Sequence, residues 1–453
     1  MSDAPQPRGG FATRIGFVLA AAGSAVGLGN IWKFPYITGE YGGGAFVLVY
    51  LFCIALVGLP LMYAELIIGR RGGSDVLGSL RKLTQSSGPA GAAVSYAVGG
   101  MAVASGFLIL SFYAVVAGWA VYYALAYAGL FPLEAGGDMF GSLYGKNKSL
   151  PWHTFFMVLS VGVVAAGVNG GIERACKVLM PMLAAILGIL LVYVGVTGGL
   201  SESFTFLFKP DFDRLLRAED GGLKPDAILE ALGHAFFTLS LGMGAMVTYG
   251  SYLKSEVAVV RDGIIVAILD TVIALVAGLV IFAVVFSHEG AEPGAGPGLV
   301  FVTLPGLFAD MPGGQVFGFA FFVLLVFAAW SSAISLLEVV VAFLVDSLKL
   351  DRKMAALGAG FAIWGLGIWP ARSTSALDLL DNITTKYMLP LGGLGIAIAA
   401  GWLLTKEDRE AGFRALGPIG DVLAKGWTVI IRFVTPVLVA LVILNKLGVL
   451  GGE

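Results

Sequence analysis

The chain has 453 residues, of which 58% are hydrophobic and only 13% are charged. A soluble domain carries about 25% charged residues, so this composition excludes an ordinary soluble protein and indicates one that lies in a membrane. The formal net charge of −2 gives no basis for a nucleic-acid partner. Cys53 and Cys176 lie in or beside separate apolar segments, which speaks against a disulfide scaffold.

Eleven apolar stretches are long enough to cross a bilayer, which takes about 20 helical residues. They cover residues 13–38, 43–69, 93–127, 153–170, 174–197, 227–253, 263–287, 315–347, 353–370, 376–404 and 423–449. We therefore expect an all-α membrane protein with about eleven transmembrane helices, and residues 1–453 form a single transmembrane domain.

Lysine and arginine set the expected orientation. Most of them fall in segments that share one side of the membrane if the N-terminus is cytoplasmic, and an excess of Lys and Arg marks the cytoplasmic side. An odd number of spans then places the C-terminus outside. We expect the chain to lie in the cell membrane and to cross it several times.

The first span, residues 16–38, contains Gly23, Gly27 and Gly29 together with Ser24 and Asn30. Glycine stabilises helix interiors poorly. In hydrocarbon, unwound backbone persists only where it is buried in protein or lines a cavity. There, the freed carbonyl groups can hold a cation, so this span predicts an ion-coupled transporter.

The sixth span, residues 227–253, is interrupted in a similar way by Thr238, Ser240, Gly242 and Gly244. Paired interruptions at corresponding places in two halves are typical of inverted-repeat transporters with a binding site at the membrane midplane. Close helix packing is the alternative, because Gly23 and Gly27 also form a GxxxG pattern.

Three strings carry a resemblance to a known family: GSAVGLGNIWKFPY followed by GGGAF, then GIERACKVLMP, then FFTLSLGMGAMVTYGSY. They resemble the neurotransmitter:sodium symporter family, most closely its prokaryotic amino-acid transporters with eleven spans. The resemblance implies a transporter and not an enzyme, with two five-helix inverted repeats (spans 1–5 and 6–10). The first repeat would cover about 13–197 and the second about 227–404, with an extra span at about 423–449.

The resemblance also implies two sodium sites, and every matching position supplies oxygen, which hard cations prefer. The first site would use the Ala25 carbonyl with Asn30, Thr238 and Asp270. The second would use the carbonyls of Gly23, Val26 and Ala328 with the hydroxyls of Ser331 and Ser332. For the two serines alone, easier helix contact is the alternative explanation.

Asp270 is a carboxylate inside an apolar span, where a charge is expensive and marks a functional site by default. The alternative is a structural ion pair. Many animal members of the family have asparagine at this position and need chloride nearby. Because Asp270 supplies the negative charge here, we expect transport that needs sodium but not chloride.

The resemblance places an amino-acid substrate between the two broken spans. Its carboxylate would meet sodium, the backbone N–H groups near Leu28 and Gly29, and the Tyr113 hydroxyl. Its amino group would meet carbonyls near Ala25, Phe237 and Thr238 and the hydroxyls of Ser240 and Ser332. Its side chain would lie against Ser24, Ile109, Phe237, Met243 and Leu336, an uncharged wall that favours an apolar or aromatic side chain. Gly27 leaves room for a substrate that brings its own carboxylate.

Two gates are expected on either side of the pocket. Lys33 and Asp381 would form the outer pair, with Tyr113 and Phe237 as a lid. Because lysine lacks the bidentate fork of arginine, this pair would be loose or water-mediated. Arg8 and Asp346 would form the inner pair, supported by Tyr249 and Tyr252, with Phe11 beside Arg8.

Two buried polar residues have no expected role, His234 and Glu338. The function expected from sequence is a symporter that imports a hydrophobic or aromatic L-amino acid with two sodium ions by alternating access. A sodium-dependent channel, which needs a continuous polar pore, and a membrane receptor that binds without transport are the alternatives.

Overall fold

The computed structural model describes residues 9–133, 136–145, 148–216, 226–253, 259–288, 290–291, 293 and 298–446. Within these ranges the regular structure is helical, without a β-strand. The helices of the first half are α1 (Arg14–Ala25), α2 (Phe34–Glu40), α3 (Gly44–Cys53), α4 (Leu59–Gly72), α5 (Val76–Leu83), α6 (Gly88–Tyr127), α7 (Gly136–Gly145), α8 (Ser149–Ala165), α9 (Arg174–Thr197), α10 (Leu200–Phe208) and α11 (Phe212–Leu216).

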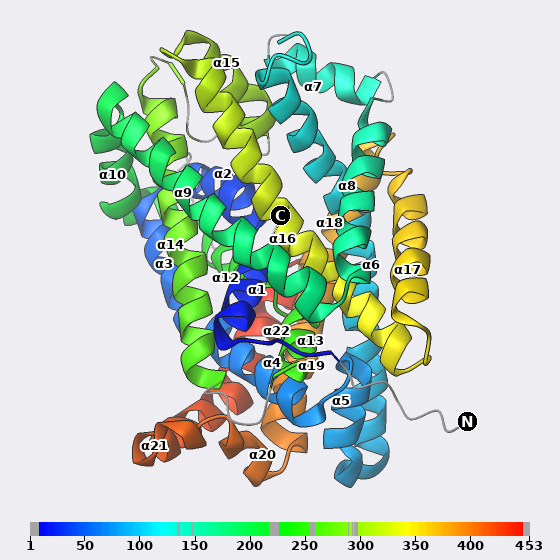
Figure 1. Ribbon diagram of the computed structural model, residues 1–453. Helices are drawn as coiled ribbons and strands as arrows, with labels where there is room; N and C mark the ends of the chain where they lie inside the picture. Colours follow the sequence, from blue (N-terminus) through cyan, green and yellow to red (C-terminus); the bar gives the residue numbers. More distant parts are fainter. Residues whose placement is uncertain are drawn as a thin grey trace.

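The second half continues with α12 (Asp226–Thr238), α13 (Ala245–Ser251), α14 (Val259–Phe286), α15 (Leu304–Asp310), α16 (Gly314–Asp346), α17 (Arg352–Gly367), α18 (Thr374–Asp381), α19 (Leu389–Ile398), α20 (Lys406–Ala411), α21 (Pro418–Val429) and α22 (Thr435–Lys446). Wider π-helical turns join several of them: η1 (Gly29–Lys33), η2 (Ile54–Gly58), η4 (Val168–Glu173), η6 (Leu299–Thr303), η7 (Asn382–Met388), η8 (Ala399–Leu403) and η10 (Ile430–Val434). The helices stand roughly side by side as one bundle (Figure 1).

Helices occupy all eleven segments that the sequence predicts to span the membrane. Seven are continuous and apolar enough to cross a bilayer by length and composition, namely Gly44–Gly72, Gln85–Tyr127, Val168–Thr197, Val259–Phe286, Gly314–Asp346, Thr374–Leu403 and Pro418–Asn445. An eighth is the pair Arg14–Ala25 and Gly29–Glu40, bent by 45° at its break. The other three are α8, the interrupted pair α12 and α13, and the 16-residue α17. The expected all-α fold is confirmed.

Both predicted breaks are present. After α1 the backbone becomes extended at Val26, with φ −72° and ψ 106°. Between α12 and α13 the chain takes positive φ at Ser240 (54°), Gly242 (80°) and Gly244 (79°). Residues 242 and 244 are glycine because L side chains rarely adopt such angles.

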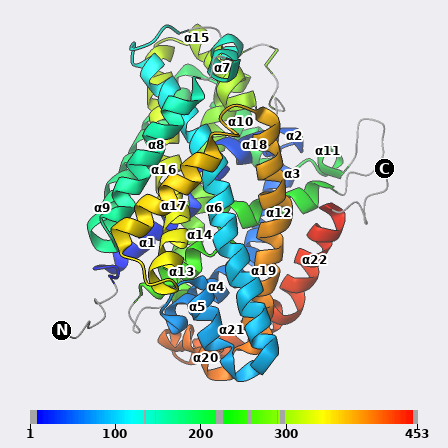
Figure 2. The same ribbon diagram turned by 90° about the vertical axis from the view of Figure 1, so that its right-hand side faces the viewer.

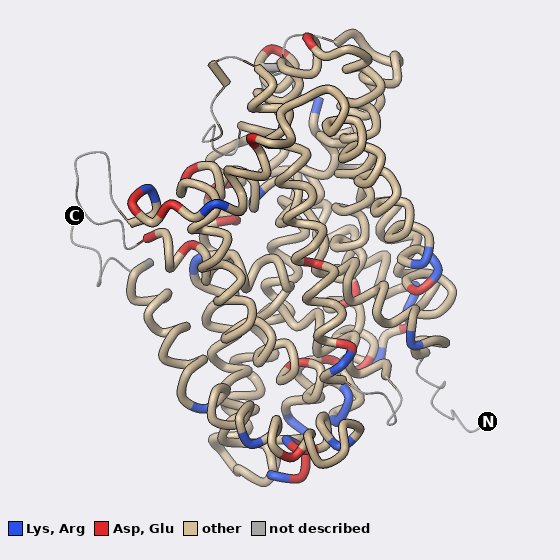
Figure 3. Tube along the Cα trace, turned by 90° about the vertical axis from the view of Figure 1, so that its left-hand side faces the viewer, with Lys and Arg blue, Asp and Glu red and all other residues tan. Residues whose placement is uncertain are grey.

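The two longest helices, α6 and α16, pack against each other through the middle of the bundle, next to α1 (Figures 1 and 2). A helix rises 1.5 Å per residue, so the 40 residues of α6 exceed the roughly 30 Å of a hydrocarbon core. The third span must therefore tilt or protrude from the bilayer. Charged residues concentrate toward the ends of the bundle and are sparse in its middle (Figure 3).

Candidate functional site

The breaks in the first and sixth spans face each other across a small cavity. It is lined by Ser24, Ala25, Gly27, Leu28, Gly29, Ile109, Tyr113, Phe237, Ser240, Met243, Ser332 and Leu336. These are all the residues predicted to contact substrate except Thr238, which lies beside Asn30. The free volume is only about 20 Å³, room for about one water molecule. The walls must separate to admit an amino acid.

Unwound backbone supplies polar groups at this cavity. Leu28 N donates to the Tyr113 hydroxyl oxygen over 3.1 Å, so the tyrosine proton stays available for another acceptor. The Ser240 hydroxyl donates to Ser24 O over 2.7 Å and joins the two broken spans. The interior of this site therefore combines fixed backbone dipoles with apolar side chains.

The cavity has no room for a side chain at position 27. A Cβ atom added there would lie 2.4 Å from Ser332 Oγ and 2.8 Å from Tyr113 Oη. Both distances are well below van der Waals contact, and neither hydroxyl belongs to a long flexible side chain. The position therefore accepts glycine alone unless α6 or α16 shifts.

A first cluster of oxygen atoms surrounds the Asn30 side chain. Its Nδ2 donates to Asp270 Oδ1 (2.7 Å), Asp270 O (3.1 Å) and Thr238 Oγ1 (3.2 Å). The Thr238 hydroxyl lies 3.1 Å from both Asp270 carboxylate oxygens. Asp270 is fully buried, and no Lys or Arg in the described ranges pairs with it. The structural ion pair considered for Asp270 is therefore not found among these residues.

A second cluster lies where α16 passes the break after α1. The Ser332 hydroxyl is 3.3 Å from Gly23 O and 3.2 Å from Val26 O. The Ser331 hydroxyl is 3.0 Å from Ala328 O and 3.5 Å from Val26 O. All five predicted ligands of the second sodium site are thus brought together, and their oxygens are the kind that sodium prefers.

On one side of the cavity lies the predicted outer pair. Lys33 Nζ stands 4.7 Å from the centroid of the Phe237 ring. Lys33 and Asp381 line a common cavity of about 240 Å³ together with His234, but the salt bridges among the described residues do not include one between them. The loose or water-mediated pairing of Lys33 with Asp381 stays a prediction. His234 packs against Phe34 and Tyr50, with ring centroids 5.9 and 5.3 Å away.

On the other side, Phe11 packs edge to face on Tyr249 and Tyr252, with centroids 5.6 and 6.2 Å apart. Arg8 lies outside the described residues, so its pairing with Asp346 is not observed. Glu338, which had no expected role, accepts hydrogen bonds from Tyr252 (2.5 Å) and from both terminal nitrogens of Arg352 (3.0 and 2.6 Å).

Two carboxylates were missed in the sequence. Glu65, fully buried in α4, accepts a hydrogen bond from Gly242 N over 2.7 Å and so holds the break of the sixth span. Glu173 accepts from Ala12 N and the Thr13 hydroxyl, both over 2.7 Å, and fixes the chain before α1. For Glu65 the available signal was the same as for Asp270, an acidic residue within an apolar segment. Glu173 lies between two predicted spans and carries no such signal.

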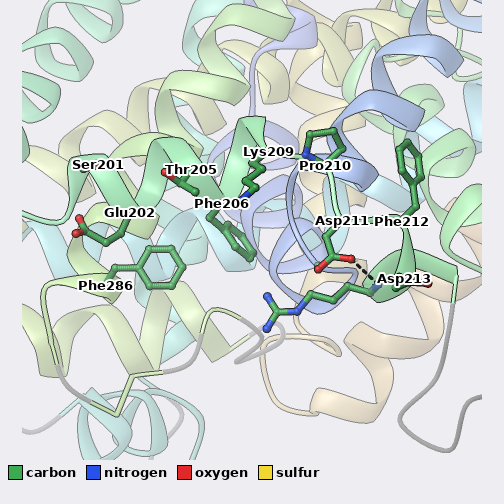
Figure 4. A pocket seen from close by; sticks show the side chains of 12 residues that line it. Ser201, Glu202, Thr205, Phe206, Lys209, Pro210, Asp211, Phe212, Asp213 and Phe286 are labelled. Carbon is green, nitrogen blue, oxygen red and sulfur yellow. Dashed lines mark hydrogen bonds between the residues drawn. The ribbon is translucent and has the colours of Figure 1, made fainter.

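A larger cavity of about 860 Å³ lies away from these residues, between α10, α11 and Gly42. Figure 4 shows it with charged walls that include Glu202, Lys209 and Asp211. It opens to the surface and contains none of the predicted site residues. Size alone therefore does not identify the functional cavity, whereas the meeting of two broken helices does.

Comparison with known proteins agrees with this fold. The sequence profile described as the sodium:neurotransmitter symporter family matches residues 8–132 and 145–450. An uncharacterized sodium-dependent transporter of Bacillus subtilis is 36% identical over 97% of this chain and 98% of its own length. One from Methanocaldococcus jannaschii is 31% identical over 98% and 91%.

A solved structure is similar throughout. The crystal structure of MhsT in complex with L-phenylalanine is 42% identical, covers 97% of this chain and 100% of the other, and gives a TM-score of 0.84. Family, relatives and fold are those of transporters and not of enzymes. The chain belongs to the sodium:neurotransmitter symporter family and is a sodium-dependent membrane transporter.

Proposed function

We propose that the protein imports hydrophobic or aromatic L-amino acids together with sodium by alternating access. One observation carries this proposal: the cavity between the broken spans pairs unwound backbone and the Tyr113 hydroxyl with an apolar wall. The backbone groups suit the carboxylate and amino group common to all amino acids, and Ile109, Met243 and Leu336 suit an apolar side chain. The likeness to MhsT, solved with L-phenylalanine, supports the same substrate class.

Two sodium ions are proposed, one in each oxygen cluster. Ala25, Asn30, Thr238 and Asp270 would hold the first ion, and Gly23, Val26, Ala328, Ser331 and Ser332 the second. Both clusters include the break of the first span, and the first cluster also includes Thr238 at the break of the sixth span. Ion binding would therefore order the same backbone that binds substrate, which couples the two binding events.

Transport without chloride is proposed from Asp270. This carboxylate lies beside Asn30 and Thr238 and has no basic partner among the described residues. A sodium ion there would be balanced by a charge that belongs to the protein. The sodium- and chloride-dependent glycine transporter 1 of Xenopus laevis is 26% identical over 84% of this chain, so chloride dependence is the outcome that a test of Asp270 must distinguish.

The remaining assignments complete the proposed carrier. The two repeats (about 13–197 and 227–404) and the extra span (about 423–449) form one domain in the cell membrane, with the N-terminus cytoplasmic and the C-terminus outside. Lys33 and Asp381 gate the outer side. Arg8 and Asp346, with the Phe11 aromatic cluster, gate the inner side.

Uptake by the purified full chain in liposomes tests this function. Radiolabelled leucine, phenylalanine and tryptophan are supplied outside with an inward sodium gradient, and choline or potassium replaces sodium in matched samples. Concentrative uptake that needs sodium supports the proposal. Sodium-dependent binding without accumulation supports a receptor, and flux that does not saturate supports a channel.

A further inference from the structure

Two arginines meet where the last two apolar segments touch, at the end of the bundle that carries α20 and α21 (Figures 1 and 2). Arg432 lies in η10, within the segment Pro418–Asn445, and its Nε donates to Gly401 O over 2.5 Å. Arg409 of α20 donates through Nη1 to Leu404 O (2.5 Å) and to the same Gly401 oxygen (3.4 Å). Two positive charges thus share one carbonyl.

The local backbone is shaped for this approach. A Cβ atom on Gly401 would lie 2.9 Å from Arg432 Cγ, so only glycine lets the arginine come this close. Gly401 is in η8 and Arg432 in η10, and these two π-helical turns pack on each other. Such turns inside α-helices are uncommon and frequently occur at functional sites.

The acidic residues of α20 are all engaged by other cations. The pairs are Lys406–Glu410 (3.7 Å), Arg414–Glu407 (3.6 Å) and Arg71–Asp408 (2.5 Å). In the described part of the chain, neither Arg409 nor Arg432 has a carboxylate within ion-pairing distance. Burial and the neighbouring Arg432 charge lower the pKa of Arg409 by more than the charge of Glu410, which is paired with Lys406, raises it. The pair therefore has an unbalanced charge that an anion would neutralise.

Both arginines retain donors for such an anion. A guanidinium carries five N–H groups, and the bonds above use only Nε of Arg432 and Nη1 of Arg409. Beside them, Trp402 and Phe433 are 46% and 59% exposed and pack edge to face at 6.0 Å. An exposed tryptophan such as Trp402 is typical of the membrane–water interface.

We propose that Arg409 and Arg432 bind the phosphate of an anionic phospholipid, whose acyl chains lie against Trp402 and Phe433. Arginine binds phosphate with two parallel hydrogen bonds, and basic pockets between membrane helices recognise anionic headgroups. A single cation would be enough to cap the last carbonyls of the tenth span. Capping therefore does not explain Arg432, a charged residue within an apolar segment, where a charge is costly. The site is independent of the transported substrate.

Quenching of Trp402 by brominated lipid tests the site in the full-length protein. The chain has eight tryptophans, so the Trp402 signal is the difference between wild type and Trp402→Phe. Brominated phosphatidylglycerol is compared with brominated phosphatidylcholine in mixed micelles. We expect roughly threefold or greater preference for phosphatidylglycerol. The preference disappears in Arg409→Gln/Arg432→Gln and persists in the control Arg414→Gln, whose arginine is already paired with Glu407.

Equal quenching by both lipids in the wild type overturns the proposal, and so does an unchanged preference in the double variant. A competition that needs no variant guards against misfolding. Unbrominated phosphatidylglycerol relieves the quenching, whereas phosphatidylcholine and inorganic phosphate do not. Relief by inorganic phosphate would show a general anion site and would also overturn the assignment to a lipid.

Discussion

At the scale of single residues, the proposed first sodium site depends most on the carboxylate of Asp270. Its carboxylate contacts Asn30 and Thr238 at 2.7 to 3.1 Å in a fully buried setting. An unpaired buried charge is strongly unfavourable, so a bound cation would relieve a cost already present in the ion-free protein. The proposed sodium affinity of the first site depends on this charge.

Asp270→Asn keeps the size of the side chain and removes the charge. We expect the apparent sodium affinity for uptake to fall about tenfold or more, which is 1.4 kcal/mol or more, and chloride to restore part of it. Uptake is measured against sodium concentration in chloride and in gluconate. Asp378→Asn, at an exposed position of α18, is the control. Wild-type uptake that collapses in gluconate would contradict the role of Asp270.

Gly27→Ala tests the fit of the substrate cavity. The added Cβ would lie 2.4 Å from Ser332 Oγ, and overpacking of this kind costs about 1–3 kcal/mol, or roughly 5- to 150-fold in affinity. We expect the concentration for half-maximal uptake to rise by that factor. Gly100→Ala in α6, where nothing lies within 4 Å, is the matched control and leaves uptake unchanged.

At the scale of elements, the break between α12 and α13 is held by specific backbone geometry. Gly242 has φ 80°, and a Cβ there would lie 2.3 Å from Leu389 O. Its N–H is bonded to Glu65, 177 residues earlier. The unwound segment is therefore part of the packed structure and is fixed by the second and tenth spans.

Gly242→Ala should therefore lower stability and uptake together. A side chain held at such a φ costs about 1–3 kcal/mol, before the clash with Leu389 O is counted. Gly233→Ala in α12, with nothing within 4 Å, should instead gain up to about 1 kcal/mol of helix stability. Thermal unfolding of both variants in detergent is the measurement. Equal melting temperatures would show that the break tolerates a side chain.

The broken spans also show which features of the site can be predicted from sequence alone. Breaks at residues 23–30 and 238–244 are predictable because glycine and hydroxyl residues in an apolar span conflict with an unbroken hydrogen-bond ladder. The grouping of Asn30 with Asp270 came from family resemblance, since 240 residues separate them. Glu65 and Glu173 were missed because their partners include the backbone N–H groups of Gly242 and Ala12, more than 150 residues away along the chain, which no sequence pattern marks.

At the scale of the whole molecule, several contacts hold the segment before α1 and the first turn of α1 against the rest of the bundle. Glu173 binds Ala12 N and Thr13, and Arg14 pairs with the buried Asp262 of α14. Phe11 packs on the aromatic residues of α13 and just beyond. Opening this side for release would require these contacts to separate together.

Glu173→Ala should loosen this closure, and native Cys176 reports it. Cys176 is fully buried in α9, three residues after Glu173. In a Cys53→Ser background, we expect maleimide to label Cys176 about tenfold faster or more in the variant, because the lost contacts are worth at least about 1.4 kcal/mol of opening. Lys177→Ala, which removes another partner of Glu173 but neither N-terminal contact, is the control. Unchanged labelling would place the closure elsewhere.

The hydroxyls of the second oxygen cluster have a consequence for the empty carrier. The Ser331 hydroxyl lies within hydrogen-bonding distance of Ala328 O, and the Ser332 hydroxyl lies within that distance of Gly23 O and Val26 O. Each of the two hydroxyl protons therefore has a buried carbonyl acceptor without an ion. When a cation arrives, each hydroxyl need only rotate to turn its lone pair inward. The two serines would then hydrogen-bond to carbonyls in the unloaded protein and coordinate the ion in the loaded one. The unloaded protein would therefore reset across the membrane with part of this polar cluster already hydrogen-bonded.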